Sequence, residues 1–310
     1  MSVRIFDSAA LECLAAIVEE GGFERAAVRL SITQSAVSQR LRGLEAQVGT
    51  VLLVRTRPVR PTAAGRLLLK HAMQMRLLRA DLEGDLQELA PGASGEEYRV
   101  SIAINADSIA TWALDALDPL IAAGLPLEII TDDQDFTHEW LREGQVLGCV
   151  TTLKPALRGC QVLSLGAMHY VAVASAAYAE AHCPQGLSAH NFRDIPFIAF
   201  NRKDDSPAEF VATAWGLRRV TLNQRFVPSS EGQVHAVLSG WGAAVLPRLR
   251  VQALMDSGAL VNLAPQHSLP VELYWHCWNL DSEVIDRLTA ALSSAARRVL
   301  EKIPHSHKLI

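Results

Sequence analysis

Two short helical patterns, separated by a break, lie near the start of the chain in the sequence FERAAVRLSITQSAVSQRLRGLE at residues 23–45. In the first pattern, apolar residues recur with the i, i+3, i+4, i+7 spacing of one buried helix face: Phe23, Ala26, Ala27 and Leu30. The break at residues 31–33 ends in Thr33, whose hydroxyl can accept a free backbone amide of the following helix. This arrangement predicts two helices joined by a tight turn.

The second pattern has an apolar face and a polar face. Its apolar residues are Ala36, Val37, Leu41 and Leu44, and its other face carries Gln34, Ser35, Ser38, Gln39, Arg40 and Arg42. No carboxylate precedes Glu45 on this helix, so the polar face offers hydrogen-bonding groups and cations, which suit base edges and phosphates in a major groove. An ordinary helical hairpin with a solvated outer face is the alternative. The break length, the cap and the missing acids together favour a helix-turn-helix.

A short apolar run at residues 51–54 is followed by RTRPVRP at residues 55–61. Three arginines, two prolines and no acid predict a wing, a two-stranded turn that contacts the DNA backbone; a solvated loop is the alternative. We therefore expect one set of side chains to face the bases, namely Gln34, Ser35, Ser38 and Gln39. A second set is expected to hold the phosphate backbone, namely Arg42, Arg55 and Arg57.

Charge is unevenly distributed along the chain. The formal net charge is −4, which by itself argues against nucleic-acid binding. Residues 1–79, however, hold 12 Arg and Lys against 6 Asp and Glu, whereas the remainder holds 17 against 27. A basic head on an acidic body is the asymmetry expected when only the head meets DNA.

The N-terminal motifs resemble those of a known family. The runs GGFERAAVRLSITQSAVSQRLRGLEAQVG, LLVRT and RPTAAG are similar to the DNA-binding end of LysR-type transcriptional regulators. The segments FERAA, ITQSAVSQR, LLVRT, NADSIATW and LYWHCW resemble one branch more closely, the regulators that sense lysine or arginine and control basic amino-acid export or metabolism. The resemblance extends over nearly the whole chain.

This resemblance implies an α/β protein with three parts. They are an N-terminal winged helix-turn-helix at residues 1–62, a linker dimerisation helix at residues 63–90, and an effector-binding domain at residues 97–310 that resembles type 2 periplasmic binding proteins. The effector domain would have two α/β lobes with a ligand cleft between them. Lobe I would comprise residues 97–164 and 269–310, and lobe II residues 165–268.

A single apolar stripe runs along the predicted linker helix, which begins after the capping residue Thr62. Its members are Leu67, Leu68, His71, Met75, Leu78, Leu82, Leu86 and Leu89. A helix this long with one stripe needs a partner surface, and LysR-type proteins dimerise through it. The segment PGASG at residues 91–95 predicts a hinge-like domain boundary.

Strand and helix patterns alternate after residue 97. Strands are predicted at residues 98–104, 126–131, 148–153, 166–174, 196–200, 242–246 and 271–278, and helices at 107–122, 136–143, 207–215, 231–239, 248–257 and 282–302. Such alternation predicts parallel α/β sheets. From the family's organisation, the chain is expected to cross between lobes near residues 162–166 and to return near 264–269.

Polar residues follow the first two of these strands. Asn105, Asp107 and Ser108 open a helix, where free amides predict an anion site for an α-carboxylate; Asp107 as a simple N-cap is the alternative. The second strand ends in Asp132, Asp133 and Gln134, at the edge where α/β sheets bind ligands. Many LysR-type proteins carry Ser or Thr for an anionic effector where this chain has Gln134. That departure, with the neighbouring acids, favours a cationic ligand.

The second predicted lobe repeats the pattern. Asn201 and Asp204 follow a strand, and Ser230 and Glu231 begin a helix. Two acidic strand ends that face one cleft would balance an ammonium or guanidinium group. This agrees with L-lysine or L-arginine, the effector that the resemblance implies. Solvated acidic turns are the alternative for the single residues, and a regulator with a non-basic effector is the alternative for the whole chain.

Other functional classes lack support in the sequence. It contains no nucleophile elbow, P-loop, HExxH or dinucleotide fingerprint, so we expect neither an enzyme nor a bound cofactor. Five cysteines without CxxC spacing favour free thiols over disulfides or a zinc site. No apolar run is long enough to span a bilayer and the N-terminus lacks a cleavable signal, which predicts a cytoplasmic protein without a membrane partner.

The expected partners follow from the resemblance. They are double-stranded promoter DNA, the amino-acid effector, further copies of the chain in a homodimer or homotetramer, and RNA polymerase. Two other interpretations stay open: a nucleoid-type binder with little sequence preference, and a ligand-binding protein or enzyme with an incidental helical head. The basic head argues against the second of these.

Overall fold

The computed structural model describes residues 6–89, 99–132 and 136–303. At its N-terminal end, three helices form a small head: α1 (Ser8–Glu19), α2 (Phe23–Arg29) and α3 (Gln34–Val48). The hydroxyl of Thr33 accepts the amide of Ala36 at 3.2 Å, so the predicted cap of α3 is confirmed. Gly49, with a φ of 87°, ends α3 in the left-handed conformation that glycine adopts readily.

The head has its own apolar core and a wing. The core joins α1 to α3 through residues such as Leu14, Ile17, Val37, Leu41 and Leu44. Strands β1 (Leu53–Val54) and β2 (Arg60–Pro61) pair antiparallel, so the arginine-rich segment between them forms the tip of the predicted two-stranded wing. The helix-turn-helix and its wing therefore form one compact unit.

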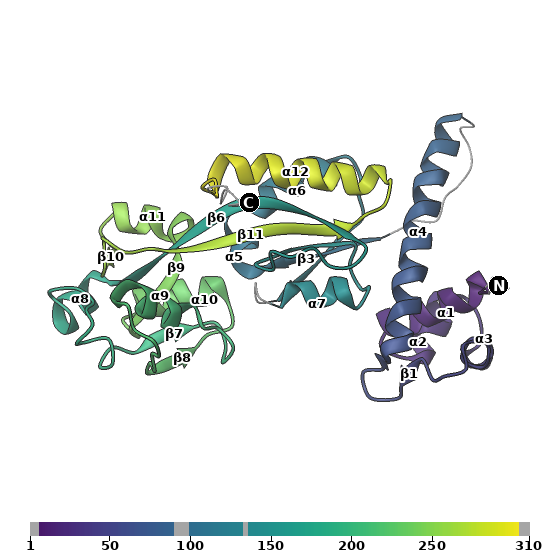
Figure 1. Ribbon diagram of the computed structural model, residues 1–310, viewed down its shortest axis with the longest axis horizontal. Helices are drawn as coiled ribbons and strands as arrows, with labels where there is room; N and C mark the ends of the chain where they lie inside the picture. The colour runs from purple at the N-terminus through teal and green to yellow at the C-terminus, as the bar shows by residue number, and fades with distance from the viewer. Residues whose placement is uncertain (1–5, 90–98, 133–135, 304–310) are drawn as a thin grey trace, which may run out of the picture.

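Helix α4 (Ala63–Leu89) leaves the head as a long rod beside the effector domain (Figure 1). The Thr62 hydroxyl accepts the amide of Gly65 at 3.1 Å at its start. Leu68, Leu69 and Ala72 pack into the head core, whereas Met73 and Leu77 belong to the core of the effector domain. Arg76 forms ion pairs with Glu12 and Glu19 of α1, so the first half of α4 is fixed to the head.

The predicted stripe on α4 divides into two sets. Five members are exposed in the single chain, namely Leu67, His71, Met75, Leu78 and Leu82. Leu68 is instead buried in the head, because it lies one residue round the helix from Leu67. The side chains of Leu86 and Leu89, and the predicted linker at residues 91–95, lie outside the described part of the chain.

One mixed sheet organises the effector domain. Its strands are β3 (Val100–Asn105), β4 (Leu127–Asp132), β5 (Gly148–Thr151), β6 (Cys160–Ser175), β7 (Phe197–Ala199), β8 (Gln224–Phe226), β9 (Ala243–Pro247), β10 (Leu260–Asn262) and β11 (Leu269–Trp278). The strand order is β4-β3-β5-β11-β6-β9-β7-β8, and β10 pairs with β6. We call the half that contains β3, β4 and β5 lobe I, and the half that contains β7 to β10 lobe II.

The expectation of parallel sheets is correct within each lobe and wrong between them. β3 pairs parallel with β4 and β5, and β7 pairs parallel with β8 and β9. The two long strands β6 and β11 pair antiparallel with each other and with their neighbours in both lobes. The expected crossover at residues 162–166 therefore lies inside a continuous strand, and the expected return at 264–269 meets the start of β11. A one-residue bulge at Leu165 lets β6 keep its pairing with β11.

Helices cover both faces of this sheet. They are α5 (Ala106–Ser108), α6 (Leu114–Ala122), α7 (Thr137–Arg142), α8 (Ala176–His182), α9 (Ser206–Trp215), α10 (Ser230–Leu238), α11 (Arg248–Asp256) and α12 (Glu283–Val299). A π-helical turn (Ile109–Ala113) joins α5 to α6, so the predicted helix at 107–122 is one continuous but irregular segment. In lobe I, α6 and α12 lie on one face and α7 on the other (Figure 1).

Three short elements were not predicted, namely α8, β8 and β10. The sequence of α8 continues the apolar run before it, and the two strands have only three residues each, so none of the three gives a separate pattern. In the described ranges, no helix combines the length and apolar character needed to cross a membrane.

Candidate functional site

The outward face of α3 is accessible. Gln34, Ser35, Gln39 and Arg42 are exposed and Ser38 is half-buried, while Val37 and Leu41 of the same helix are buried. The guanidinium of Arg42 donates to the backbone carbonyl of Ser38 at 3.3 Å, which holds it beside that face. The polar set predicted to read bases therefore lies together on one surface.

The wing adds cations to this surface. Arg55 and Arg57 are exposed, and the Arg55 guanidinium lies 5.7 Å from the centre of the Phe23 ring at the start of α2. Among the described residues, Arg42, Arg55 and Arg57 form no ion pair with a carboxylate. Their charges are therefore available to phosphate groups.

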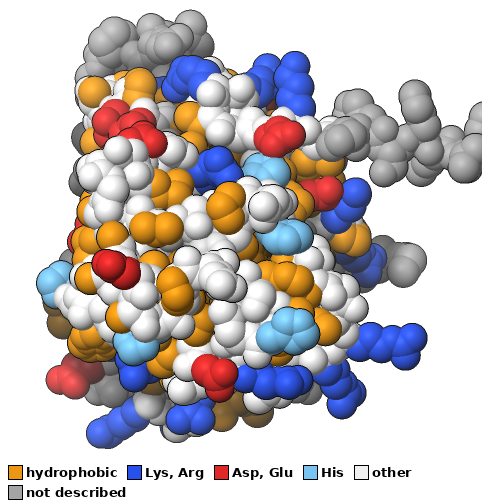
Figure 2. All heavy atoms as spheres, turned by 90° about the vertical axis from the view of Figure 1, so that its left-hand side faces the viewer, with side chains coloured by type: hydrophobic (Ala, Val, Ile, Leu, Met, Phe, Trp, Pro, Cys, Tyr) orange, Lys and Arg blue, Asp and Glu red, His pale blue; other side chains and the backbone are white. Residues whose placement is uncertain are grey.

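The opposite end of the molecule has a different surface. Figure 2 shows the end of lobe II, where apolar side chains, histidines and charges of both signs are interspersed. The outward face of α3, in contrast, presents amides, hydroxyls and cations before its first acid at Glu45. The head is therefore the better candidate for the nucleic-acid interface.

A second candidate site is a cleft where the two lobes meet. It is open to solvent and is lined by Asn105, Ala106, Asp107, Asp132, Tyr170, Phe200, Asp204, Ser206, Gln233 and Val245. Asn105 and Asp132 are register partners at the carboxyl ends of the parallel strands β3 and β4. Such strand ends are the usual ligand-binding edge of α/β sheets, and Asn105 and Asp132 lie at this edge.

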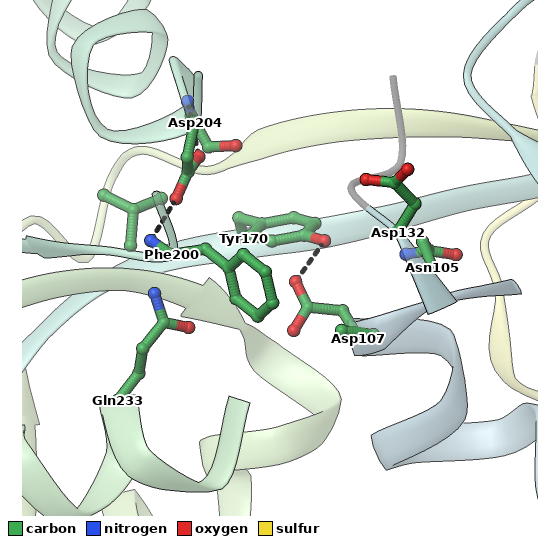
Figure 3. A pocket seen from close by; sticks show the side chains of 10 residues that line it. Asn105, Asp107, Asp132, Tyr170, Phe200, Asp204 and Gln233 are labelled. Atoms are coloured by element: carbon green, nitrogen blue, oxygen red, sulfur yellow. Dashed lines mark hydrogen bonds between the residues drawn. The ribbon is translucent and has the colours of Figure 1, made fainter. Parts of the chain in front are cut away.

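Asp107 joins three parts of the cleft. The hydroxyl of Tyr170 on β6 donates to its Oδ2 at 2.8 Å, and the hydroxyl of Ser230 on α10 donates to its Oδ1 at 2.9 Å (Figure 3 shows the first bond). The alternative role as an N-cap is wrong, because α5 follows Asn105 and has no side-chain cap. Burial raises the pKa of Asp107, and the two hydrogen bonds lower it without cancelling that effect.

The other two acids of the cleft are held by single-lobe contacts. Asp132 Oδ2 accepts the indole Nε1 of Trp140 at 3.1 Å. Asp204 accepts two backbone amides, from Phe200 at 2.8 Å and from Ser206 at 3.1 Å, and so shapes the turn before α9. The carboxylates are thus oriented before any ligand arrives, which favours binding by preorganisation.

Two polar groups at the start of α5 have no partner in the described residues. The Asn105 Oδ1 and the Ser108 Oγ are both buried and unpaired. Asn105 also lines the cavity, so its side-chain oxygen is available to a ligand donor. Buried polar atoms are normally hydrogen-bonded, so these two groups can accept or donate to a further partner.

Four of the predicted effector residues that the structure describes do not line this cavity, namely Ser108, Asn201, Ser230 and Glu231. Asn201 turns back to accept the amide of Lys203 at 2.7 Å. Glu231 follows Ser230 on α10 and therefore points about 100° away from it; it is exposed and lies 3.7 Å from Arg250. Asp133 and Gln134 lie outside the described residues. The placement thus gives no support to a ligand contact at Asn201, and it puts Glu231 in an adjoining cavity that shares Ala106 and Phe200 with the cleft.

Sequence reasoning missed three prominent residues of the cleft, namely Tyr170, Phe200 and Gln233. Tyr170 lies within an apolar run and showed no signal of its own. Gln233 could have been found, because it lies three residues after Ser230 on the same face of α10 and is buried although polar.

Comparisons with known proteins identify the family. Residues 8–66 match the model for bacterial regulatory helix-turn-helix proteins of the lysR family, and residues 93–297 match the LysR substrate binding domain. The chain belongs to the LysR family. It is accordingly a DNA-binding transcriptional regulator with an effector domain, as its motifs predicted.

Individual LysR-family proteins are similar over nearly their whole length. The transcriptional regulator ArgP of Aeromonas salmonicida is 39% identical over 300 residues, which cover 96% of this chain and 99% of that protein. The regulator LysG of Mycobacterium bovis is 40% identical over 290 residues, covering 94% and 93%. These relatives are transcriptional regulators, which agrees with the absence of catalytic motifs from the sequence.

Solved LysR-family structures confirm the fold class. ArgP from Mycobacterium tuberculosis superposes with a TM-score of 0.84 at 38% identity, covering 97% of this chain and 100% of that one. LysG from Corynebacterium glutamicum with bound effector Arg has a TM-score of 0.73 at 32% identity, covering 95% and 99%. The predicted winged helix-turn-helix, linker helix and α/β effector domain are therefore the architecture of the family.

Proposed function

We propose that this regulator binds promoter DNA through α3 and the wing, and that it responds to L-lysine or L-arginine held in the cleft. The observation that carries the choice of effector is the charge of the cavity. Three carboxylates line it, those of Asp107, Asp132 and Asp204, and no lysine or arginine occurs among its lining residues. A cationic ligand relieves the mutual repulsion of these acids, whereas an anionic one adds to it.

The groups around the cavity match the parts of a basic amino acid. The Asn105 side-chain oxygen and the carboxylates can accept hydrogen bonds from an α-ammonium and from a distal ammonium or guanidinium. The side-chain amide of Gln233 is a donor that lines the same space and suits an α-carboxylate (Figure 3). The arginine bound to LysG of Corynebacterium glutamicum, at 32% identity, supports the same ligand class.

In DNA binding, the amides and hydroxyls of α3 and the three arginines have different roles. Gln34, Ser35, Ser38 and Gln39 would contact base edges from α3, because their side chains carry both donors and acceptors. Arg42, Arg55 and Arg57 would contact phosphates, which fixes the register without reading sequence. We propose genes of basic amino-acid export or metabolism as targets, with RNA polymerase as the partner at the promoter.

The assembly is proposed to be a dimer through α4, with two dimers forming a tetramer. The exposed stripe carries the proposal: Leu67, Leu78 and Leu82 expose 74%, 44% and 56% of their surface in the single chain. A row of large apolar side chains along one helix is stabilised by burial against a second helix. The two recognition helices of a dimer would then face successive major grooves.

Titration of the full-length protein with amino acids tests the proposed effector. L-Arginine and its neutral isostere L-citrulline differ mainly in the charge of the side chain. A charge-assisted hydrogen bond contributes about 1.5–3 kcal/mol. We therefore expect Asp132→Asn to weaken binding of L-arginine at least about tenfold more than binding of L-citrulline. Isothermal titration calorimetry measures both. Asp281→Asn is the matched control, because it makes the same change at an exposed acid outside the cleft and should leave both affinities unchanged.

Two results would contradict the proposed effector. One is an equal loss of both ligands in Asp132→Asn, which would show that the side-chain charge is not read there. The other is a preference of the wild type for a dicarboxylate such as L-glutamate over L-arginine and L-lysine. Neither result would change the assignment to the LysR family.

A further inference from the structure

Helix α7 contacts lobe II at its N-terminal end. The ring of Phe136, the residue before α7, faces the ammonium of Lys203 with the Nζ 4.3 Å from the ring centre. Lys203 belongs to the turn between β7 and α9, so this cation–π contact links the two lobes. One end of α7 therefore contacts lobe II directly.

The middle of α7 contacts the cleft through one side chain. Trp140 donates its indole Nε1 to the Oδ2 of Asp132, which lines the cavity. Trp140 is also among the residues that line a groove between the sheet and the linker helix, together with Met73 and Arg76 of α4. Trp140 thus bonds to a residue of the effector cleft and borders the groove beside the linker helix.

The turn after α7 lies directly against α4. Gly144 has a φ of 75°, and a Cβ placed on it would lie only 2.6 Å from the Cα of Lys70. The ammonium of Lys70 donates a hydrogen bond to the backbone carbonyl of Arg158 at 3.2 Å, which is a further contact between α4 and lobe I. Because the backbones of Gly144 and Lys70 are in close contact, a displacement of this turn toward α4 would displace α4.

We propose that α7 transmits occupancy of the cleft to the linker helix, with Trp140 as its positioning residue. The inference rests on the proposed function, because the signal is the arrival of an ammonium or guanidinium at Asp132. A cation that draws the Asp132 carboxylate toward the ligand weakens its bond with Trp140. Helix α7 then shifts, and α4 follows through the contact of Gly144 with Lys70. The ligand drives this change by binding the shifted arrangement more tightly.

The first test removes the indole donor and keeps an aromatic ring. Trp140→Phe is compared with Trp275→Phe, whose indole donates to Thr289 at 2.9 Å and lines neither the cleft nor the groove beside α4. The probe is an operator selected by this protein from a random DNA pool, titrated with and without L-arginine and followed by fluorescence anisotropy. We expect Trp140→Phe to bind L-arginine within about threefold of wild type and to lose most of the ligand-induced change in DNA affinity, which is about 5- to 150-fold in allosteric proteins. Trp275→Phe should keep that change.

The second test acts on the other end of the proposed path. Gly144→Ala places a Cβ against the Lys70 backbone. Gly159→Ala is the matched control, because Gly159 has a φ of 73° but its Cβ would approach only the flexible Lys70 Nζ, at 3.5 Å. Both substitutions carry a similar cost for the positive φ. Hydrogen–deuterium exchange without ligand should show faster exchange within α4, by about threefold or more, in Gly144→Ala than in Gly159→Ala.

The results distinguish the inference from the proposed function. A wild-type response to L-arginine in Trp140→Phe, or equal exchange in the two alanine variants, would overturn the inference. The exchange measurement needs no ligand, so it tests the contact of α7 with α4 independently of the effector. If the wild type binds no basic amino acid, the proposed function is rejected but the exchange result still applies. In the double variant Trp140→Phe/Gly144→Ala, a ligand response equal to that of either single variant supports one path, and additive losses contradict it.

Discussion

At the scale of single residues, the head separates side chains that can read bases from those that can hold phosphates. Replacing Gln34 or Ser38 with alanine removes a base contact, so we expect operator binding to weaken by about 1–3 kcal/mol while binding to random DNA is nearly unchanged. Arg57→Ala should instead weaken both DNAs alike and reduce the slope of log affinity against log salt by about one. Fluorescence anisotropy over a salt series measures each quantity. Equal losses on operator and random DNA in Gln34→Ala would contradict the base-reading role.

Single residues also show which features of the molecule could be predicted from the sequence. The cap at Thr33 and the outward set on α3 were predictable, because both depend on neighbours within one or two helical turns. Asp107 was singled out correctly as a cleft residue, but its partners Tyr170 and Ser230 lie 63 and 123 residues further along the chain. No local pattern records which hydroxyl will meet a carboxylate across that separation.

At the scale of elements, α4 carries a surface that the single chain leaves uncovered. Leu78 exposes 44% of its surface, and we expect a second copy of α4 to cover it. Leu78→Glu would then bury an unpaired charge in the dimer, which costs several kcal/mol and should cause dissociation or a changed assembly. Sedimentation velocity measures the outcome. Leu238→Glu is the matched control, since Leu238 exposes 40% on α10 and is not part of the stripe. An unchanged assembly in Leu78→Glu would mean that α4 dimerises through another face or not at all.

The elements that sequence reasoning misjudged are those whose pairing is set by the whole sheet. Strand β6 was predicted to begin at residue 166, which leaves out a stretch that contains the polar residues Gln161 and Ser164. In the structure it begins at Cys160 and pairs with β11 along that polar stretch, past the bulge at Leu165. Cross-strand partners, rather than the strand's own residues, therefore determine its length.

At the scale of the whole molecule, β6 and β11 make the two lobes parts of one sheet, while the side chains at the cleft decide how the lobes meet. Asp107 of lobe I accepts a hydrogen bond from Ser230 of lobe II, and Lys203 of lobe II lies over the Phe136 ring of lobe I. Both contacts involve a charged group. The relative arrangement of the lobes should therefore respond to charges that enter the cleft, and α7 places the linker helix within reach of that response.

The charge of Asp107 also makes the stability of the molecule depend on pH. Burial raises the pKa of Asp107 above its ordinary value of 3.8, so the folded chain keeps this proton to a higher pH than the unfolded chain. Between the two pKa values the folded state binds more protons, and the contribution of Asp107 to stability falls as pH rises through that window. Asp107→Asn has no such proton to lose. We expect the melting temperature of Asp107→Asn to rise relative to wild type as pH increases from about 4, and the difference to level off above the raised pKa. In a domain of this size, each kcal/mol of unfolding free energy shifts the melting temperature by about 2–4 °C.

Thermal unfolding of wild type and Asp107→Asn across pH 4 to 8, in buffers matched at about 0.15 M ionic strength, measures this difference. The exposed Asp281 supplies the control, because Asp281→Asn removes a carboxylate outside the cleft and should follow wild type at every pH. A difference that stays constant with pH would contradict the raised pKa of Asp107. Saturating L-arginine adds a further check: a guanidinium beside Asp107 favours the charged form, so the ligand should stabilise wild type more than Asp107→Asn at pH 7 and lose that advantage as Asp107 becomes protonated.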